Sequence, residues 1–273
     1  MQNSTWRLIS TPPAHGSWNM SVDEAIMEAT NSHSCRPTLR LYSWHPYCLS
    51  IGHAQSIEEV NVDKLSDLGW GLVRRPTGGR AILHADELTY SISAPLDDPN
   101  VRGGVLESYR YFSICFLKAL ENIGIGADSK PKNATEKKLS KDPVCFQYPS
   151  DYEITFKGKK LIGSAQARKK NGLLQHGAIP LYGDITRILS VLNFQSGEKR
   201  CQAKLNLSDR AITIQSIIGQ MISWENLSTE IVAAFEQVMG IKFITSNLTK
   251  GELNRAKVLE KQKYSNDEWT FRI

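Results

Sequence analysis

The segment whose residue types could most clearly take part in chemistry is 74–84, with the sequence RRPTGGRAILH. Adjacent glycines let backbone N–H groups approach a ligand closely and turn towards one oxygen atom, so this segment could bind a carbonyl, carboxylate or phosphate. A plain hairpin with arginines at a solvated strand end explains the same residues equally well, because the phosphate-loop and dinucleotide-binding patterns are absent. The binding candidates in this segment are Arg74, Gly78, Gly79, Arg80 and His84.

A second candidate is Cys145, which lies between two prolines in the segment PVCFQYP. A lone cysteine is more often a small buried apolar residue than a nucleophile. A nearby cation can lower the pKa of a thiol from about 8.5 into the range of roughly 3.5–7.5 and so supply the reactive thiolate. Lys160 is the nearest plausible cation, but contact requires residues 145–150 to double back by about 16 Å, at roughly 3.3 Å per residue. The spacing permits this contact without requiring it.

The strand that carries Lys160 holds two further candidates. Side chains alternate along a strand, so Lys160 and Ser164 should share one face. Gly163 interrupts this strand, which usually marks a bulge or a close approach of another backbone. His176 follows in QHG, where a hydrogen-bonded structural role is a more common explanation than catalysis.

Mixed strands and helices must position these residues. Alternating or short apolar runs predict strands at 39–44, 48–52, 72–74 and 88–93, and a hairpin at 151–165 turns at Lys157 and Gly158, with a third strand at 173–181. Apolar residues at three- and four-residue intervals predict a helix over 109–123, and a capping-box pattern at Ser21 and Glu24 predicts another helix start.

The C-terminal part has a different character. The sequence predicts helices from about residue 208, including one that starts at a second capping box over residues 249–252. Residues 129–141 carry five lysines and few apolar side chains, which predicts an exposed loop. No linker or repeat divides the chain, so we expect a single domain over residues 1–273 with a helix-rich C-terminal part.

Composition limits the class of protein. The 273 residues are 41% hydrophobic and 22% charged, which excludes disordered and low-complexity classes. A net charge of +5 suits an acidic partner but does not indicate nucleic acid. No apolar run reaches the length of a membrane span and the N-terminus lacks a secretory pattern, so neither membrane insertion nor secretion is expected. The five cysteines are odd in number and form no metal-binding pattern, which favours a reducing cytoplasm.

Five motifs in order resemble the lipoate-protein ligase and octanoyltransferase superfamily, and within it most closely the LipM-type octanoyl-[acyl-carrier-protein]:protein N-octanoyltransferases. They are RRPTGGRAILH (74–84), ELTYS (87–91), VCF (144–146), GKKLIGSAQ (158–166) and LQHG (174–177). The similarity starts at Trp6 and continues to about Leu181, roughly two thirds of the chain.

The resemblance implies an α+β fold, with mixed β-sheets and packed helices, related to the catalytic domain of biotin protein ligases. It places Cys145 at the nucleophile position of the transferases and Lys160 at the lysine shared by ligases and transferases. The glycine-containing segment lines the acyl pocket in the family. Substrate-binding roles are therefore expected for Arg74, Gly78, Gly79, Arg80 and His84, together with Gly163 and Ser164.

The implied reaction transfers an octanoyl group from octanoyl-acyl carrier protein to a lysine of a lipoyl domain, such as that of the glycine cleavage H protein, in lipoate biosynthesis. Cys145 would carry the group as a thioester, which splits the transfer into two steps. No cofactor, metal or ATP is needed, because exchange between thioesters is nearly isoenergetic and amide formation is downhill. Neither a nucleic acid nor a membrane is an expected partner.

Three alternatives remain open from the sequence. In an ATP-dependent lipoate-protein ligase, Lys160 and the glycine-containing segment would handle an acyl-adenylate and Cys145 would be incidental. The residues after Asn193 are few for the accessory domain that such ligases commonly use. An amidotransferase would take octanoyl from another lipoyl domain, and a non-catalytic acyl-binding module would show no turnover that depends on Cys145.

Overall fold

Two β-sheets form the framework of the computed structural model, which describes residues 4–101, 103–129, 153–169 and 172–273. The larger sheet has eight strands, in the spatial order β11 (Ile241–Thr245), β1 (Ser4–Ser10), β2 (Thr38–Tyr42), β6 (Glu87–Pro95), β10 (Gly172–Pro180), β9 (Lys159–Lys169), β8 (Ile154–Phe156) and β7 (Asp128–Ser129). The smaller sheet has the order β4 (Gly71–Arg74), β3 (Cys48–Ile51) and β5 (Ile82–His84). Both sheets mix parallel and antiparallel pairs, which confirms the predicted α+β class.

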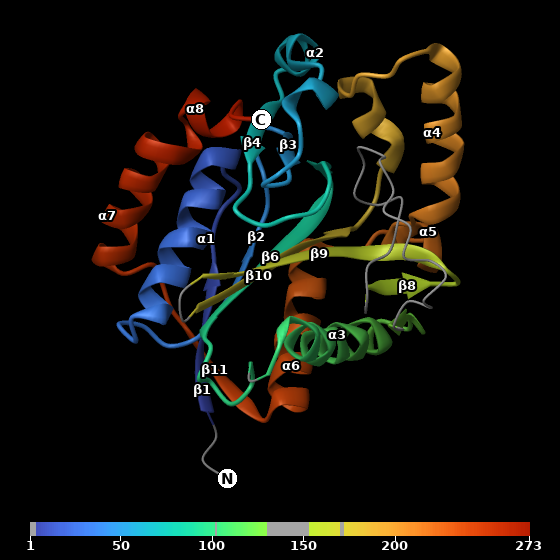
Figure 1. The fold of residues 1–273 in the computed structure, drawn as a ribbon. Helices are drawn as coiled ribbons and strands as arrows, with labels where there is room; N and C mark the ends of the chain where they lie inside the picture. Colours follow the sequence, from blue (N-terminus) through green and yellow to red (C-terminus); the bar gives the residue numbers. More distant parts are fainter. Residues whose placement is uncertain (1–3, 102, 130–152, 170–171) are drawn as a thin grey trace.

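Helices cover both faces of the larger sheet (Figure 1). Helix α1 (Gly16–Asn31) packs against β6 and β10, and α7 (Lys250–Leu259) packs on α1, followed by η5 (Glu260–Tyr264) and α8 (Asp267–Thr270). On the opposite face lie α3 (Val105–Asn122) and α6 (Trp224–Met239), which pack against each other. The remaining helical segments are η1 (Ile57–Glu59), α2 (Val62–Asp67), η4 (Ile185–Val191), α4 (Gly197–Arg210) and α5 (Ile214–Ile218).

The main core lies between the larger sheet and the pair α3 and α6. Phe112 and Phe116 stand one turn apart on α3 and meet Phe235 of α6, with the Phe116 and Phe235 ring centroids 5.1 Å apart. Every residue of β6 and β10 is buried, because helices cover both sides of these central strands. The apolar period of α3 and the two-sided burial of β6 and β10 therefore fix the centre of the fold.

Several predicted elements are confirmed. The hairpin turns at Lys157 and Gly158, and Thr155 pairs with Lys160 across β8 and β9. A capping box between Thr249 and Glu252 starts α7, as the sequence pattern predicted. Residues 130–152, which contain most of the predicted lysine-rich loop and all of the segment around Cys145, lie outside the described residues.

One expectation needs correction, and two further strands add to the predicted elements. Helix α1 starts at Gly16, with His15 as its N-cap, so the proposed capping box is wrong. Ser21 lies inside the helix, where its hydroxyl donates to the backbone oxygen of Ser17 at 2.6 Å. The return from the glycine-containing segment forms a separate strand, β5, and the helix-rich tail contains the strand β11, which pairs in parallel with β1. Of the described helices, none is both long enough and apolar enough to span a membrane.

Candidate functional site

A partly open pocket lies where the smaller sheet faces β9, β10 and β6 of the larger one, with about 360 Å³ of empty space when the solvent at its mouth is included. Residues from six strands, from α1 and from the segment after β4 converge on this space. Its wall consists of Met20, Tyr42, Trp44, Ser50, Arg75, Ile82, His84, Thr89, Gly163, Ser164, Ala165, His176, Gly177 and Ala178. We call this space the central cavity. Of the predicted binding residues, His84, Gly163 and Ser164 line it.

His84 is held on both ring nitrogens. Its Nε2 lies 2.7 Å from the hydroxyl of Ser50, and its Nδ1 lies 2.5 Å from the carboxylate of Glu87. The indole of Trp44 stacks on the imidazole, with ring centroids 3.9 Å apart, and its N–H donates to Thr89 at 2.8 Å. Because Thr89 in turn donates to Glu87, these contacts close into a ring that fixes the orientation of His84.

His176 is held in a similar way by a second set of partners. The hydroxyl of Thr77 lies 2.6 Å from its Nε2, and a carboxylate oxygen of Asp23 lies 3.3 Å from its Nδ1. Burial lowers the pKa of His176, although Asp23 opposes this shift. The ring is therefore neutral near pH 7, with Nδ1–H donating to Asp23 and Thr77 donating to Nε2.

Asp23 is the centre of a buried polar network on α1. Arg40 donates to its carboxylate at 2.7 Å, Ser91 at 2.7 Å and Tyr42 at 2.8 Å. Burial opposes ionisation of Asp23, but Arg40 and His176 outweigh that effect and hold its pKa below the usual value. The network links α1 to β2, β6 and β10, so it fixes one wall of the central cavity.

The two adjacent arginines of the glycine-containing segment diverge. Arg74 is fully buried away from the central cavity, where its guanidinium donates to backbone oxygens of Gly52, Gln55 and Thr270. Arg75 lines the cavity and donates to the backbone oxygens of Ser50 and Gly78. The structure thus places Arg74 in a structural position and Arg75 in the position expected for a binding residue.

The remaining candidates of this segment lie beside the cavity and are not part of its wall. Gly79 has a φ of 93°, a conformation that favours glycine, and its carbonyl oxygen presses against Gly52, where an added Cβ would lie 2.0 Å from it. Gly78 has open space around its Cα. Arg80 is partly exposed and reaches Glu59 at 3.3 Å, while its backbone oxygen accepts from Arg75. The turn is therefore held in shape by its own arginine and by close backbone packing.

Strands β9 and β10 each carry a glycine where they line the central cavity, and each glycine pairs with a small residue of the other strand. Gly163 pairs with Ala178, and Gly177 pairs with Ser164. A Cβ on Gly177 would lie 2.6 Å from both the Gly163 carbonyl oxygen and the Tyr90 ring. The hydroxyl of Ser164 bonds to that of Tyr90 at 2.6 Å, on the side of α3. The Gly163 carbonyl oxygen thus comes close to Gly177, where only a glycine leaves room for it.

Lys160 stands three residues before Gly163 on β9. Its side chain is 1% exposed, and its ammonium donates to the Glu153 carboxylate at 2.5 Å. A buried lysine needs such a partner to keep its charge. The Lys160 side chain is not among the residues that line the central cavity, and Cys145 lies outside the described residues.

The four described cysteines are poor nucleophile candidates. Burial raises the pKa of Cys48 and Cys115 well above the usual thiol value. Burial also raises the pKa of Cys35, which is only partly exposed, and Cys201 is exposed on α4. None of these four side chains lines the central cavity.

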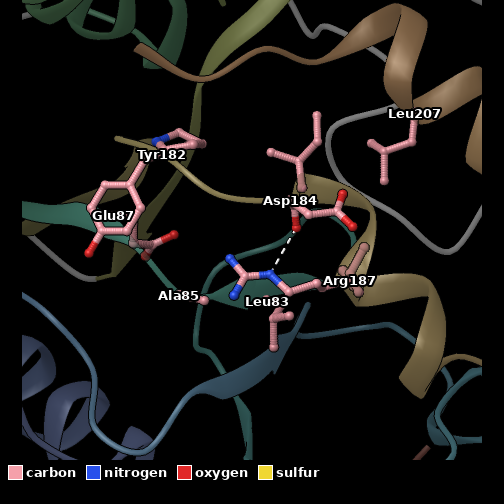
Figure 2. Close-up of a pocket in the computed structure, with 10 residues that line it drawn as sticks. Leu83, Ala85, Glu87, Tyr182, Asp184, Arg187 and Leu207 are labelled. Atoms are coloured by element: carbon pink, nitrogen blue, oxygen red, sulfur yellow. Dashed lines mark hydrogen bonds between the residues drawn. The ribbon is translucent and has the colours of Figure 1, made fainter. Parts of the chain in front are cut away.

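Two further depressions share Glu87 and Tyr182 in their walls. Figure 2 shows the first, of about 470 Å³, in which Arg187 donates to the backbone oxygen of Asp184 beside Glu87 and Leu207. The second is a groove of about 1650 Å³ whose wall includes Tyr47, Tyr182, Trp224 and Glu87. Trp44 lines both this groove and the central cavity.

Several residues of the site were missed from the sequence. None of Trp44, Ser50, Thr77 and Asp23 was predicted as a site residue, and each reaches the site from a different segment. The motif at residues 74–84 contained a signal for Arg75 and Thr77, which lie close to the glycines and were noted there without a binding role. Their importance comes from the hydrogen bonds to His84 and His176, which only the fold creates.

Comparison with known proteins identifies the family. Residues 15–236 match the lipoyl protein ligase A/B catalytic domain. The chain belongs to this family. Full-length relatives named octanoyltransferase LipM include one from Carboxydothermus hydrogenoformans, 40% identical over 98% of this chain and 99% of its own length, and one from Bacillus subtilis, 34% identical over 100% of both chains. These relatives confirm the sequence prediction of an octanoyltransferase in lipoate biosynthesis.

Solved structures confirm the fold of this family member. A bi-partite lipoate protein ligase from Thermoplasma acidophilum aligns with a TM-score of 0.82 and 24% identity, covering 98% of this chain and 96% of that one. A lipoate-protein ligase A bound with ATP aligns with a TM-score of 0.79 and 24% identity, covering 99% of both chains. At this level of identity the alignments establish the shared fold of the octanoyltransferase and the ligases.

Proposed function

We propose that this octanoyltransferase works through a thioester on Cys145, with octanoyl-acyl carrier protein as donor and a lysine of a lipoyl domain, such as that of the glycine cleavage H protein, as acceptor. The observation that carries the proposal is the central cavity, a pocket whose wall includes β9, the strand that bears Lys160. Full-length relatives named octanoyltransferase LipM support the transfer of an octanoyl group.

The sheet order suggests how the acyl chain lies. The central cavity extends from β9 across β10 and β6 to Tyr42 and Trp44 at the end of β2. With the reacting carbonyl near Lys160, the apolar tail points across the strands towards Trp44. Gly163 and Ala178 leave a flat floor for such a chain, because neither presents a long side chain to it.

In the first step the Cys145 thiolate attacks the thioester carbon of the donor. The carbon–sulfur bond to the carrier breaks, and the carrier thiol leaves with a proton. In the second step the neutral amine of the acceptor lysine attacks the enzyme thioester. The amide forms as the carbon–sulfur bond to Cys145 breaks, and the proton lost by the amine is taken up by the Cys145 sulfur, which is released as the thiol. Lys160 and backbone N–H groups of the glycine-containing segment stabilise the negative oxygen that develops in both steps.

The described residues support these roles in two ways. Lys160 is buried with one carboxylate, Glu153, at 2.5 Å, so its charge is held in a low-dielectric environment where it acts strongly. The four described cysteines lie away from the central cavity, and burial raises the pKa of three of them. Cys145 is the remaining cysteine of the five.

Intact-mass measurement tests the proposal directly. We expect wild-type protein incubated with octanoyl-acyl carrier protein, without ATP, to gain one octanoyl group, which a lipoyl domain then removes. Cys145→Ala should abolish the adduct, and Lys160→Gln should slow its formation by at least about a hundredfold if the ammonium stabilises the oxyanion. The matched control is Cys201→Ala, which should acylate as the wild type does. A persistent adduct in Cys145→Ala, or strict dependence on ATP, would refute the mechanism.

A further inference from the structure

Three basic side chains surround a single indole ring near the C-terminal end of the described chain. The Arg272 guanidinium lies 4.0 Å from the Trp269 ring centroid, and the Lys263 ammonium lies 4.3 Å from it. The ring of His53 stands edge-on to the same indole at 5.7 Å. We call His53, Lys263, Trp269 and Arg272 the Trp269 cluster. It is assembled beside β3 and β4 from the loop after β3 and from the last residues of the chain (Figure 1).

The cluster carries an excess of positive charge. Lys263 and its neighbour Lys169 share one carboxylate, Glu24, at 2.6 and 3.1 Å. Arg272 donates to the backbone oxygen of His53 and has no carboxylate partner within the part of the chain that the structure describes. Three cations therefore face one carboxylate. Partial burial together with Arg272, Lys169 and Lys263 lowers the pKa of His53, as expected in a positive field.

Nearby acidic residues do not neutralise this field through contacts. Asp267 and Glu268 are exposed at the start of α8, and the described structure contains no ion pair between either of them and the cluster. Trp269 itself is anchored, because its indole N–H donates to the backbone oxygen of Arg74 at 2.8 Å. The ring thus contacts two cations, the exposed Arg272 and the largely buried Lys263, through cation–π interactions.

The position of the cluster relative to Lys160 limits what could dock there. The backbone N–H of His53 donates to Thr77 at 2.9 Å, and Thr77 contacts His176 in the wall of the central cavity. His176 pairs with Ala165, which lies five residues along β9 from Lys160, or about 16 Å at 3.3 Å per residue. A partner at the cluster must therefore deliver its reactive group across a long distance.

We propose that the Trp269 cluster docks the acidic carrier protein that donates the acyl group on a phosphopantetheine arm. The inference rests on the donor named in the proposed function. A phosphopantetheine arm is several times longer than a lysine side chain, so a carrier protein is better suited than an acceptor lysine to a docking surface distant from Lys160. The exposed Arg272 and the partly exposed Lys169 and Lys263 match the negative surface of such a carrier, and complementary charge of this kind sets encounter rates and orientation.

Charge reversal at Arg272 tests the proposal. We expect Arg272→Glu to raise the KM for octanoyl-acyl carrier protein about five- to twentyfold at low salt, and the difference from wild type to shrink as salt is added. The KM for octanoyl-pantetheine, which has neither phosphate nor carrier, should stay within about twofold, as should the KM for the lipoyl-domain acceptor. Lys199→Glu, an equal charge change on the exposed side of α4, is the matched control and should leave all three values near wild type.

Any of the following outcomes would overturn the inference. An unchanged KM for octanoyl-acyl carrier protein in Arg272→Glu would show that the cluster does not dock the carrier. An equal increase in that KM in Lys199→Glu would show a general effect of charge and would also rule out docking at the cluster. A rise in the acceptor KM alone would assign the surface to the lipoyl domain instead. If wild-type protein uses octanoyl-acyl carrier protein no better than octanoyl-pantetheine, the proposed donor fails together with the surface. Thermal unfolding of both variants confirms that the fold is intact.

Discussion

The contact between Gly52 and Gly79 gives the sharpest test of how the glycine-containing segment is positioned. A methyl group on Gly52 would lie 2.0 Å from the Gly79 carbonyl oxygen and 2.9 Å from its carbonyl carbon. Real Cβ contacts essentially never fall below 3.0 Å, so in Gly52→Ala the segment must move by about 1 Å. The obstacle is backbone and cannot be relieved by rotating a side chain.

The expected cost follows from this displacement. Forcing extra volume into a packed region typically destabilises by about 1–3 kcal/mol, and we expect that loss in the free energy of unfolding of Gly52→Ala. A shift of about 1 Å in a substrate-positioning segment can lower the rate about a hundredfold, and we expect a loss of that order in kcat/KM for octanoyl transfer. Urea unfolding and steady-state transfer to a lipoyl domain measure the two effects.

The control lies in the same segment. Gly78 has open space around its Cα, so Gly78→Ala should change the free energy of unfolding by less than about 0.5 kcal/mol. If Gly52→Ala retains wild-type stability and activity, or if Gly78→Ala loses as much stability, the steric reasoning is wrong.

Three further variants probe the walls of the central cavity. Trp44→Val should open the cavity into the adjoining groove and reduce the preference for octanoyl over dodecanoyl donors by at least about tenfold, because apolar pockets discriminate single methylenes by roughly 10–200-fold; an unchanged kcat/KM ratio would contradict this. Asp23→Asn should destabilise by about 3–5 kcal/mol in urea unfolding, since Arg40 would remain as a buried unpaired charge. The lowered pKa of His176 means that the unfolded chain binds a proton first as pH falls below about 6.5, so wild-type stability should decline there. In His176→Gln that decline should be smaller, and parallel melting-temperature profiles between pH 7.5 and 5 would refute the assignment.

The sequence alone determined the local elements with strong periodic or turn signals. The alternating hairpin with its turn at Lys157 and Gly158 predicted the pairing of Thr155 with Lys160, and the apolar period of residues 109–123 predicted most of α3. These features depend only on residues that are close in the sequence, so local backbone geometry and side-chain periodicity determine them. The ordered motifs also identified the family, and the full-length relatives confirm it.

Which polar residues meet in space was decided only by the tertiary structure. Arg74 and Arg75 are the same residue type at adjacent positions. The Arg74 side chain nevertheless donates hydrogen bonds to backbone oxygens, whereas the Arg75 side chain lines the central cavity. Sequence cannot choose between them, because adjacent side chains near a strand end point to opposite sides and the buried side depends on the packing of distant segments. Asp23 reaches His176 for the same reason: helix α1 and strand β10 are far apart in the chain and are brought together only when the core is buried.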